Sequence, residues 1–96
     1  MGHMITKRRH KDKVANLGCI LCRHLGLGET PAQLHHPRAG MGMGQRASDF
    51  DVIPLCHEHH LGKTGIHGMG TKAFTAKYGL TEKDLLDMTR EVAGVL

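Results

Sequence analysis

Hydrophobic positions in the first half of the chain form short runs separated by glycine and polar residues. The run HKDKVANL predicts a helix over residues 10–17, ended by the glycine that follows it. Residues 18–32 contain glycines, a proline and polar side chains, and therefore predict a turn and a loop. Residues 33–37 and 50–56 are β-compatible runs, so we expect a hairpin with a long connection.

The segment after the second predicted strand is helical in pattern. The residues HEHHLGK follow Cys56 directly, which predicts a strand-to-helix turn at this cysteine, and the next residues, TGIHGMG, predict a break. Thr71 predicts the start of a helix over KAFTAKY, and Gly79 predicts its end. The mixture of two short strands and several helices predicts an α+β fold class.

The last predicted helix has a start signal and an apolar face. Thr81, followed three residues later by Asp84, is typical of a capping box that opens a helix. The apolar positions that follow have helical spacing and predict packing: Leu85, Met88, Val92 and Leu96. Without a repeat or a second periodic region, we expect a single domain over residues 14–96, preceded by an arm over residues 1–13.

The chain has little material for a large apolar core. Its 96 residues include no tryptophan, one tyrosine and two phenylalanines. Small domains of this kind usually gain stability from disulfides, a structural metal or oligomerisation. Three cysteines do not make a disulfide framework, because an odd number leaves one thiol over. We therefore expect a metal.

The N-terminus resembles neither a signal peptide nor a membrane anchor. It lacks an apolar run behind a basic start, and no segment approaches the ~20 apolar residues of a membrane span. We expect an intracellular protein that does not bind membranes. Residues 1–3 read as a cloning remnant ahead of a natural start at Met4.

Positive charge is concentrated at the start of the chain. Residues 1–13 hold five basic side chains and one acidic side chain, a formal charge of +4 that equals that of the whole chain. Such an arm suits a polyanion, because neutralising phosphates releases counterions; a solvated terminus is the alternative. The candidate DNA contacts in the arm are Lys7, Arg8, Arg9 and Lys11.

Two paired motifs have the spacing of a zinc site. Cys19 and Cys22 form C-x2-C, and Cys56 and His59 form C-x2-H further along the chain. Structural zinc takes four such ligands tetrahedrally. A thioredoxin-like redox pair is the alternative for C-x2-C, but that motif belongs near a βαβ unit, and no such pattern is present.

The zinc motif uses one histidine of a dense cluster. Neighbouring strand residues point to opposite faces, so His35 and His36 have different surroundings. His59 and His60 point about 100° apart on a helix, so one can reach the zinc while the other faces elsewhere.

The ordered motifs resemble those of the HNH endonucleases, also called ββα-metal or His-Me finger nucleases. The shared order is C-x2-C, a His-His pair in LHHP, a glycine-rich loop, an acidic residue five before a cysteine, and C-x2-H-H. The chain is similar in particular to small phage and prophage HNH proteins, including the recombination-enhancement nuclease family. The resemblance implies a ββα-metal, treble-clef-like core with a structural zinc and flanking helices, in a bacterial host cytoplasm.

The resemblance also implies roles for individual residues in phosphodiester hydrolysis. His36 matches the histidine that acts as general base on water, and Asp51 matches the residue that orients its imidazole. His35, His60 and His67 match positions that bind the catalytic divalent metal. A histidine with a pKa near ~6.5 is largely neutral at cellular pH and can accept a proton from water.

Two departures from the family pattern bear on these roles. Asp51 stands where the family has asparagine, and Asp49 is a second candidate for orienting the base. His67 stands seven residues after His60, a longer gap than the one helical turn expected. Imidazole ligands suit Zn²⁺, Ni²⁺, Co²⁺ or Mn²⁺ by softness, whereas Mg²⁺ prefers oxygen. The sequence leaves the catalytic metal open, with Mg²⁺, Mn²⁺, Ni²⁺ and Zn²⁺ as the candidates.

The loop RAGMGMGQR between the predicted strands is a candidate phosphate contact. Glycine lets the backbone approach a phosphate closely, and Arg38 and Arg46 flank the loop, with Lys63 further on. A simple hairpin tip is the alternative.

The sequence therefore favours a metal-dependent DNA endonuclease or nickase, monomeric or homodimeric, with a recombinase or other phage protein as a possible partner. One alternative is a non-catalytic treble-clef module that binds nucleic acid through the arm and the zinc motif. Another is a zinc-stabilised adaptor that binds a protein.

Overall fold

The protein is a small α+β structure with one two-stranded sheet and six helices in the residues that the computed structural model describes, 7–37 and 51–94. The elements in chain order are α1 (Lys7–Asn16), α2 (Ile20–His24), β1 (Gln33–His35), β2 (Ile53–Leu55), α3 (His57–His60), α4 (Ile66–Met69), α5 (Thr71–Tyr78) and α6 (Glu82–Gly94). None of the described helices has the length and apolar character needed to cross a membrane.

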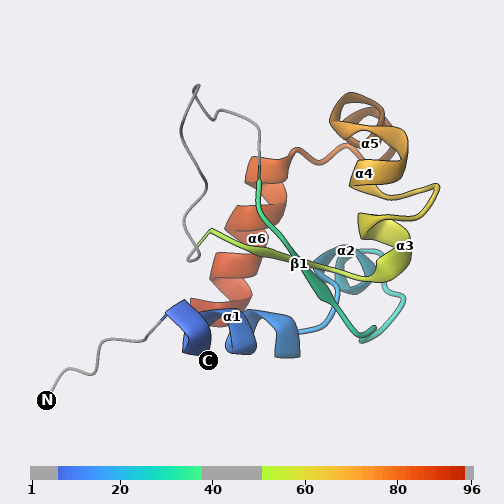
Figure 1. Ribbon diagram of the computed structural model, residues 1–96. Coiled ribbons are helices and arrows are strands. Elements are labelled where there is room, and N and C mark those ends of the chain that lie inside the picture. The colour runs from blue at the N-terminus through green and yellow to red at the C-terminus, as the bar shows by residue number, and fades with distance from the viewer. Residues whose placement is uncertain (1–6, 38–50, 95–96) are drawn as a thin grey trace, which may run out of the picture.

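The two strands pair in antiparallel register at the centre of the molecule (Figure 1). Gln33 lies opposite Leu55 and His35 lies opposite Ile53. Helices α2 and α6 pack on β2, and α1 contacts both strands. Helix α3 begins directly after β2 and leads to α4 and α5, which lie together at one side of the molecule (Figure 1). The antiparallel register therefore holds the start of α3 beside the start of β1, at Gln33.

The core is built where α2, the sheet, α5 and α6 meet. Phe74 of α5 and Leu85 of α6 are completely buried. The same cluster includes Ile20, Leu21, Ile53, Leu55, Ile66 and all three cysteines. The cysteines are therefore part of the core and are not a surface feature.

Three helices differ from the predicted elements. Helix α1 begins at Lys7, so the predicted boundary after residue 13 falls within a helix that packs against the sheet. Helix α2 lies in a predicted loop, because burial of Ile20 and Leu21 stabilises a single turn there. Helix α4 lies where a break was predicted, with Ile66 buried. Tertiary burial outweighs weak local propensity at these short helices.

The two later helices largely follow the sequence signals. Gly79 ends α5 with a left-handed backbone (φ 70°), which glycine adopts without steric cost. Thr71 gives α5 no side-chain cap, and Gly70 occupies the capping position. The capping box before α6 is present: the Thr81 backbone N–H donates to Asp84, and the Asp84 N–H donates to the Thr81 hydroxyl at 3.0 Å. These bonds lower the pKa of Asp84.

The buried face of α6 contains a carboxylate. Its buried residues are Glu82, Leu85, Thr89 and Ala93. Met88 and Val92, predicted to pack, are partly buried against the core, and Leu96 lies outside the described residues. Extending the buried face back from Leu85 by three residues reaches Glu82.

Thr81→Ala should destabilise the protein by about 1 kcal/mol, because it removes the hydroxyl that accepts from the Asp84 N–H. The measurement is the free energy of unfolding in urea. Thr81→Ser keeps the hydroxyl and should retain most of that free energy. Equal losses in the two variants would contradict a capping role for the hydroxyl.

Candidate functional site

Three cysteines and one histidine form a buried group that could hold a metal such as zinc. The four ligand atoms, from Cys19, Cys22, Cys56 and His59, lie within 4.8 Å of one another. The Sγ atoms of Cys22 and Cys56 are 3.8 Å apart, and His59 Nδ1 lies 3.3 Å from Cys56 Sγ and 3.4 Å from Cys22 Sγ. A zinc tetrahedron with sulfur ligands has edges of about 3.8 Å, so the spacing fits this ion.

Two short helices position the four side chains of this Cys3His group. Cys19 precedes α2 and its sulfur accepts from the Cys22 N–H, which places both thiols on one turn. Cys56 precedes α3, and His59 lies three residues later on the same side. Burial raises the pKa of the Cys19 thiol to about 12 and lowers the pKa of His59. A cation that binds here must therefore displace protons from thiols.

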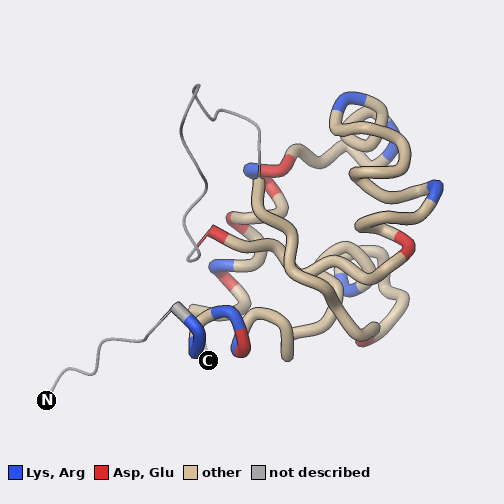
Figure 2. Tube along the Cα trace, in the orientation of Figure 1, with Lys and Arg blue, Asp and Glu red and all other residues tan. Residues whose placement is uncertain are grey.

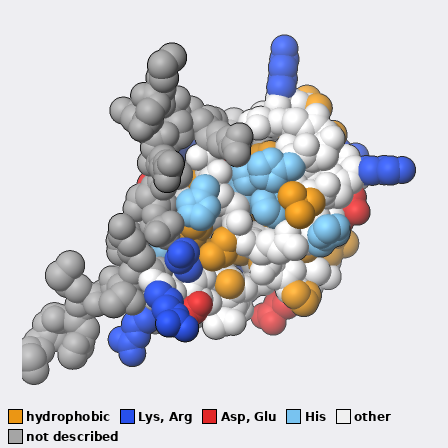
Figure 3. Space-filling view, viewed as in Figure 1, with side chains coloured by type: hydrophobic (Ala, Val, Ile, Leu, Met, Phe, Trp, Pro, Cys, Tyr) orange, Lys and Arg blue, Asp and Glu red, His pale blue; other side chains and the backbone are white. Residues whose placement is uncertain are grey.

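A second group consists of His35, His60 and His67, whose ligand atoms also lie within 4.8 Å of one another. The ring centroids of His35 are 5.3 Å from His60 and 4.9 Å from His67, and those of His60 and His67 are 4.8 Å apart. His35 is buried, His60 is half-buried and His67 is exposed. This three-histidine group therefore reaches from the core to the surface, and Figure 3 shows histidine side chains gathered on one face.

Close packing at two glycines explains how His67 returns to His60 across a gap of seven residues. A Cβ atom on Gly65 would lie 2.5 Å from the Glu58 carbonyl oxygen, and one on Gly68 would lie 1.8 Å from the Gly62 carbonyl oxygen. Only glycine permits these approaches. The loop is further fixed by Thr64, which donates to the Glu58 carboxylate through its hydroxyl at 2.7 Å.

Two of the three histidines form hydrogen bonds with side chains outside the group. Nε2 of His35 lies 2.6 Å from Oε2 of Glu82, and both side chains are buried. Nδ1 of His60 donates to Oε1 of Gln33 at 2.8 Å. Burial lowers the pKa of His35, and burial together with the neighbouring histidines lowers the pKa of His60 to about 4. Neutral imidazoles with one nitrogen engaged outward are typical of metal ligands.

The remaining predicted site residues lie in different surroundings. His36 is exposed directly after β1, and Asp51 forms an ion pair with Arg90 of α6. Lys63 is exposed in the loop between α3 and α4. Asp49, Arg38 and Arg46 lie outside the described residues.

The predicted DNA contacts of the N-terminal arm lie on α1, at one end of the molecule (Figure 2). Arg8 and Arg9 are exposed, and Lys11 is half-buried. Lys7 is the first residue of the helix. The helix therefore presents at least two arginines to solvent.

Glu82 and Gln33 were not predicted from the sequence as site residues. A signal for Glu82 is present, because it continues the buried face of α6 and a carboxylate in such a position requires a partner. Gln33 carries no comparable signal, since its role depends on the strand register and on the position of α3.

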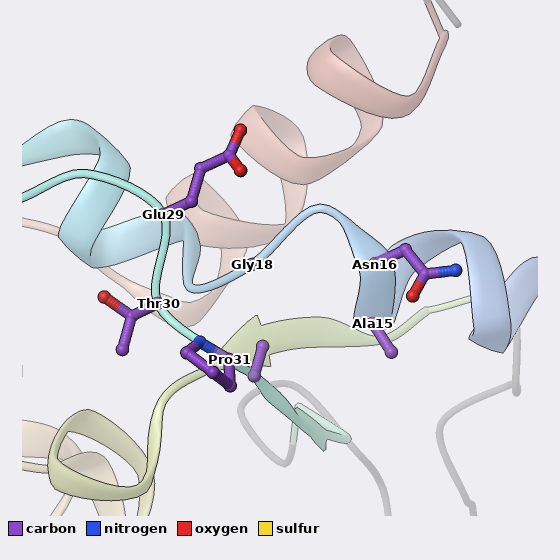
Figure 4. A pocket seen from close by; sticks show the side chains of 7 residues that line it. Ala15, Asn16, Gly18, Glu29, Thr30 and Pro31 are labelled. Carbon is purple, nitrogen blue, oxygen red and sulfur yellow. The ribbon is translucent and has the colours of Figure 1, made fainter.

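A pocket of about 460 Å³ lies elsewhere, between the end of α1 and the loop before β1 (Figure 4). Its lining comes from Ala15, Asn16, Gly18 and residues 29–32. None of the cysteine or histidine side chains of the two groups lines it. The two candidate metal-binding groups therefore lie outside this pocket.

The fold and the two groups define a small α+β protein with a Cys3His group that could hold a metal. The chain belongs to the family described as recombination enhancement, RecA-dependent nuclease, whose family model matches residues 4–94. No curated protein matches the chain. The match confirms the predicted resemblance to the recombination-enhancement nuclease family.

Cys56→Ser should remove bound zinc and abolish cooperative thermal unfolding, because binding free energy at such a site contributes to folding. The measurements are zinc per chain by atomic emission and the melting profile. His57→Ala is the matched control, since His57 is exposed on the same helix and lies outside the Cys3His group. A Cys56→Ser variant with an unchanged profile would contradict the role of this group in stability.

Proposed function

We propose that the protein is a metal-dependent DNA endonuclease or nickase of the HNH type, acting in recombination. The observation that carries the proposal is the three-histidine group, whose member His35 is followed directly in the chain by a fourth, exposed histidine, His36. The nuclease family supports hydrolysis of DNA. The antiparallel pair β1 and β2, followed directly by α3, supports the HNH type.

In this proposal His35, His60 and His67 hold one divalent cation. Their donor set fits, because three imidazoles converge and two of them are held from behind by Glu82 and Gln33. When bound, the cation supplies positive charge for the scissile phosphate and the leaving oxygen. Imidazole donors suit Zn²⁺, Ni²⁺ or Mn²⁺ better than Mg²⁺.

His36 is the proposed general base. Its exposed position next to His35 puts an imidazole at the surface where a DNA strand and a water molecule can approach. A neutral imidazole accepts a proton from that water as it attacks the phosphorus. Asp49 or Asp51 would hold this ring; Asp51 already pairs with Arg90, so it would have to serve both groups.

The Cys3His group is the proposed structural zinc site. It is buried within the core cluster, and four protein ligands leave no open position for substrate. Because His59 and His60 are consecutive, an ion in this group would also fix α3 and so the position of His60.

The substrate strand would be held by basic residues around the site. Arg8 and Arg9 of α1 are exposed, and Lys63 lies between His60 and His67 in the chain. Arg38 and Arg46 are further candidates on the loop between the strands. The family description supports a RecA-type recombinase as partner. A monomer with one such site would cut one strand at a time.

His36→Ala should lower cleavage of supercoiled plasmid by about 10²-fold or more, the scale expected when a general base is lost. His60→Ala should lower cleavage as well and, unlike His36→Ala, should reduce binding of the added cation. The assay compares Mg²⁺, Mn²⁺, Ni²⁺ and Zn²⁺, with a RecA-type recombinase and single-stranded DNA present in a parallel series.

His57→Ala is the control for both variants, because it removes an exposed imidazole of α3 outside the three-histidine group. DNA binding without cleavage in every series, unchanged by His36→Ala, would favour the non-catalytic nucleic-acid-binding module. Salt-insensitive binding of a protein and no affinity for DNA would favour the adaptor.

Replacing Arg8 and Arg9 together by alanine should weaken DNA binding most at low salt. Each lost phosphate contact should reduce the slope of log affinity against log salt by about 1. The control is Lys72→Ala with Lys77→Ala, which removes the same charge from exposed positions of α5. Equal slopes for the α1 variant and the parent protein would exclude α1 as a phosphate contact.

A further inference from the structure

We propose that Glu82 is a positioning residue that fixes His35 with its proton on Nε2 and its electron pair on Nδ1. This inference rests on the proposed cation site and names the group that sets the affinity of that site. Glu82 itself is not proposed to contact the cation, since it is not among the residues whose ligand atoms converge with those of His60 and His67.

The contact between Glu82 and His35 is short and excluded from water. Oε2 and Nε2 are 2.6 Å apart, and the two side chains are 2% and 3% exposed. A buried carboxylate without such a partner would be costly. The two residues are 47 positions apart in sequence, so the contact joins the start of α6 to the end of β1.

The backbone around Glu82 is fixed independently of His35. Glu82 is the first residue of α6, and the capping box of Thr81 and Asp84 encloses it. Leu85, one turn further, is fully buried in the core. The carboxylate therefore has little freedom to follow the imidazole, and the imidazole must adapt to the carboxylate.

A carboxylate at Nε2 determines which nitrogen can bind a cation. The carboxylate accepts a hydrogen bond from the Nε2–H group of His35, which leaves Nδ1 with the only free electron pair of a neutral ring. The negative charge also increases the basicity of the ring, as carboxylates behind metal-binding histidines do. Gln33 engages Nδ1 of His60 in the same way but without charge. His35 should therefore be the strongest of the three donors.

The first experiment observes the ring nitrogens of His35 directly. The protein is loaded with zinc in the Cys3His group, and ¹⁵N shifts of the imidazoles are recorded by NMR, with His35→Gln to assign the signals. We expect His35 in the tautomer protonated on Nε2. A proton on Nδ1 in the parent protein would overturn the proposal, whatever the behaviour of any variant.

The second experiment titrates the zinc-loaded protein with Co²⁺, whose absorption separates imidazole ligation from thiolate ligation. Glu82→Gln keeps the shape and an acceptor oxygen but removes the charge, and should weaken Co²⁺ binding by about 10- to 100-fold. Zinc in the Cys3His group should stay at one per chain. Glu91→Gln, which removes an exposed charge from the same helix, should bind Co²⁺ like the parent.

The outcomes separate the two proposals. Unchanged Co²⁺ affinity in folded Glu82→Gln would overturn the role of Glu82 while leaving the cation site intact. Absence of imidazole-ligated Co²⁺ in the parent protein would overturn the cation site and, with it, the role of Glu82. If Glu82→Gln does not fold, the tautomer of His35 in the parent protein decides the question.

Discussion

Both candidate metal-binding groups depend on the position of the single helical turn of α3. It carries two consecutive histidines, and a helical rotation of about 100° per residue turns them toward different neighbours. His59 lies with three cysteines in the core, whereas His60 lies with His35 and His67 near the surface. A shift of α3 by one residue would remove a member from both groups. The strand pair and the buried Cys56 at the start of α3 therefore fix both groups together.

Helix α6 supplies the second constraint, from the far end of the chain. Its apolar face packs on β2 and α2, and the same face begins with a carboxylate that contacts His35. Packing of Leu85 and the contact of Glu82 thus depend on one helix orientation. Arg90 extends this link on the exposed side, where it pairs with Asp51 just before β2. The C-terminal helix is therefore connected to both strands of the hairpin that carries His35.

Local signals were sufficient to predict the features that depend on neighbours in sequence. The capping box of Thr81 and Asp84, the end of α5 at Gly79 and the turn at Cys56 all occur as expected. The structure also brings together the residues of the two paired motifs. Helix α2 and the contact of Glu82 were not predicted, because each is stabilised by residues distant in the chain. The sequence indicates such long-range contacts only indirectly, for example by a carboxylate at a position that continues the apolar face of a helix.

The clustering of histidines follows from the small number of elements that this chain holds firmly in place. A chain with two phenylalanines and no tryptophan has few means of holding separate loops in place, so its groups must share the best-fixed elements. The short strand β1 and the turn of α3 are the segments that the sheet and the cysteines hold together. His35 and His60 therefore have defined positions, and no further segment has to lose conformational entropy to hold them. His67 reaches the same point only because Gly65 and Gly68 allow the loop to fold back against α3.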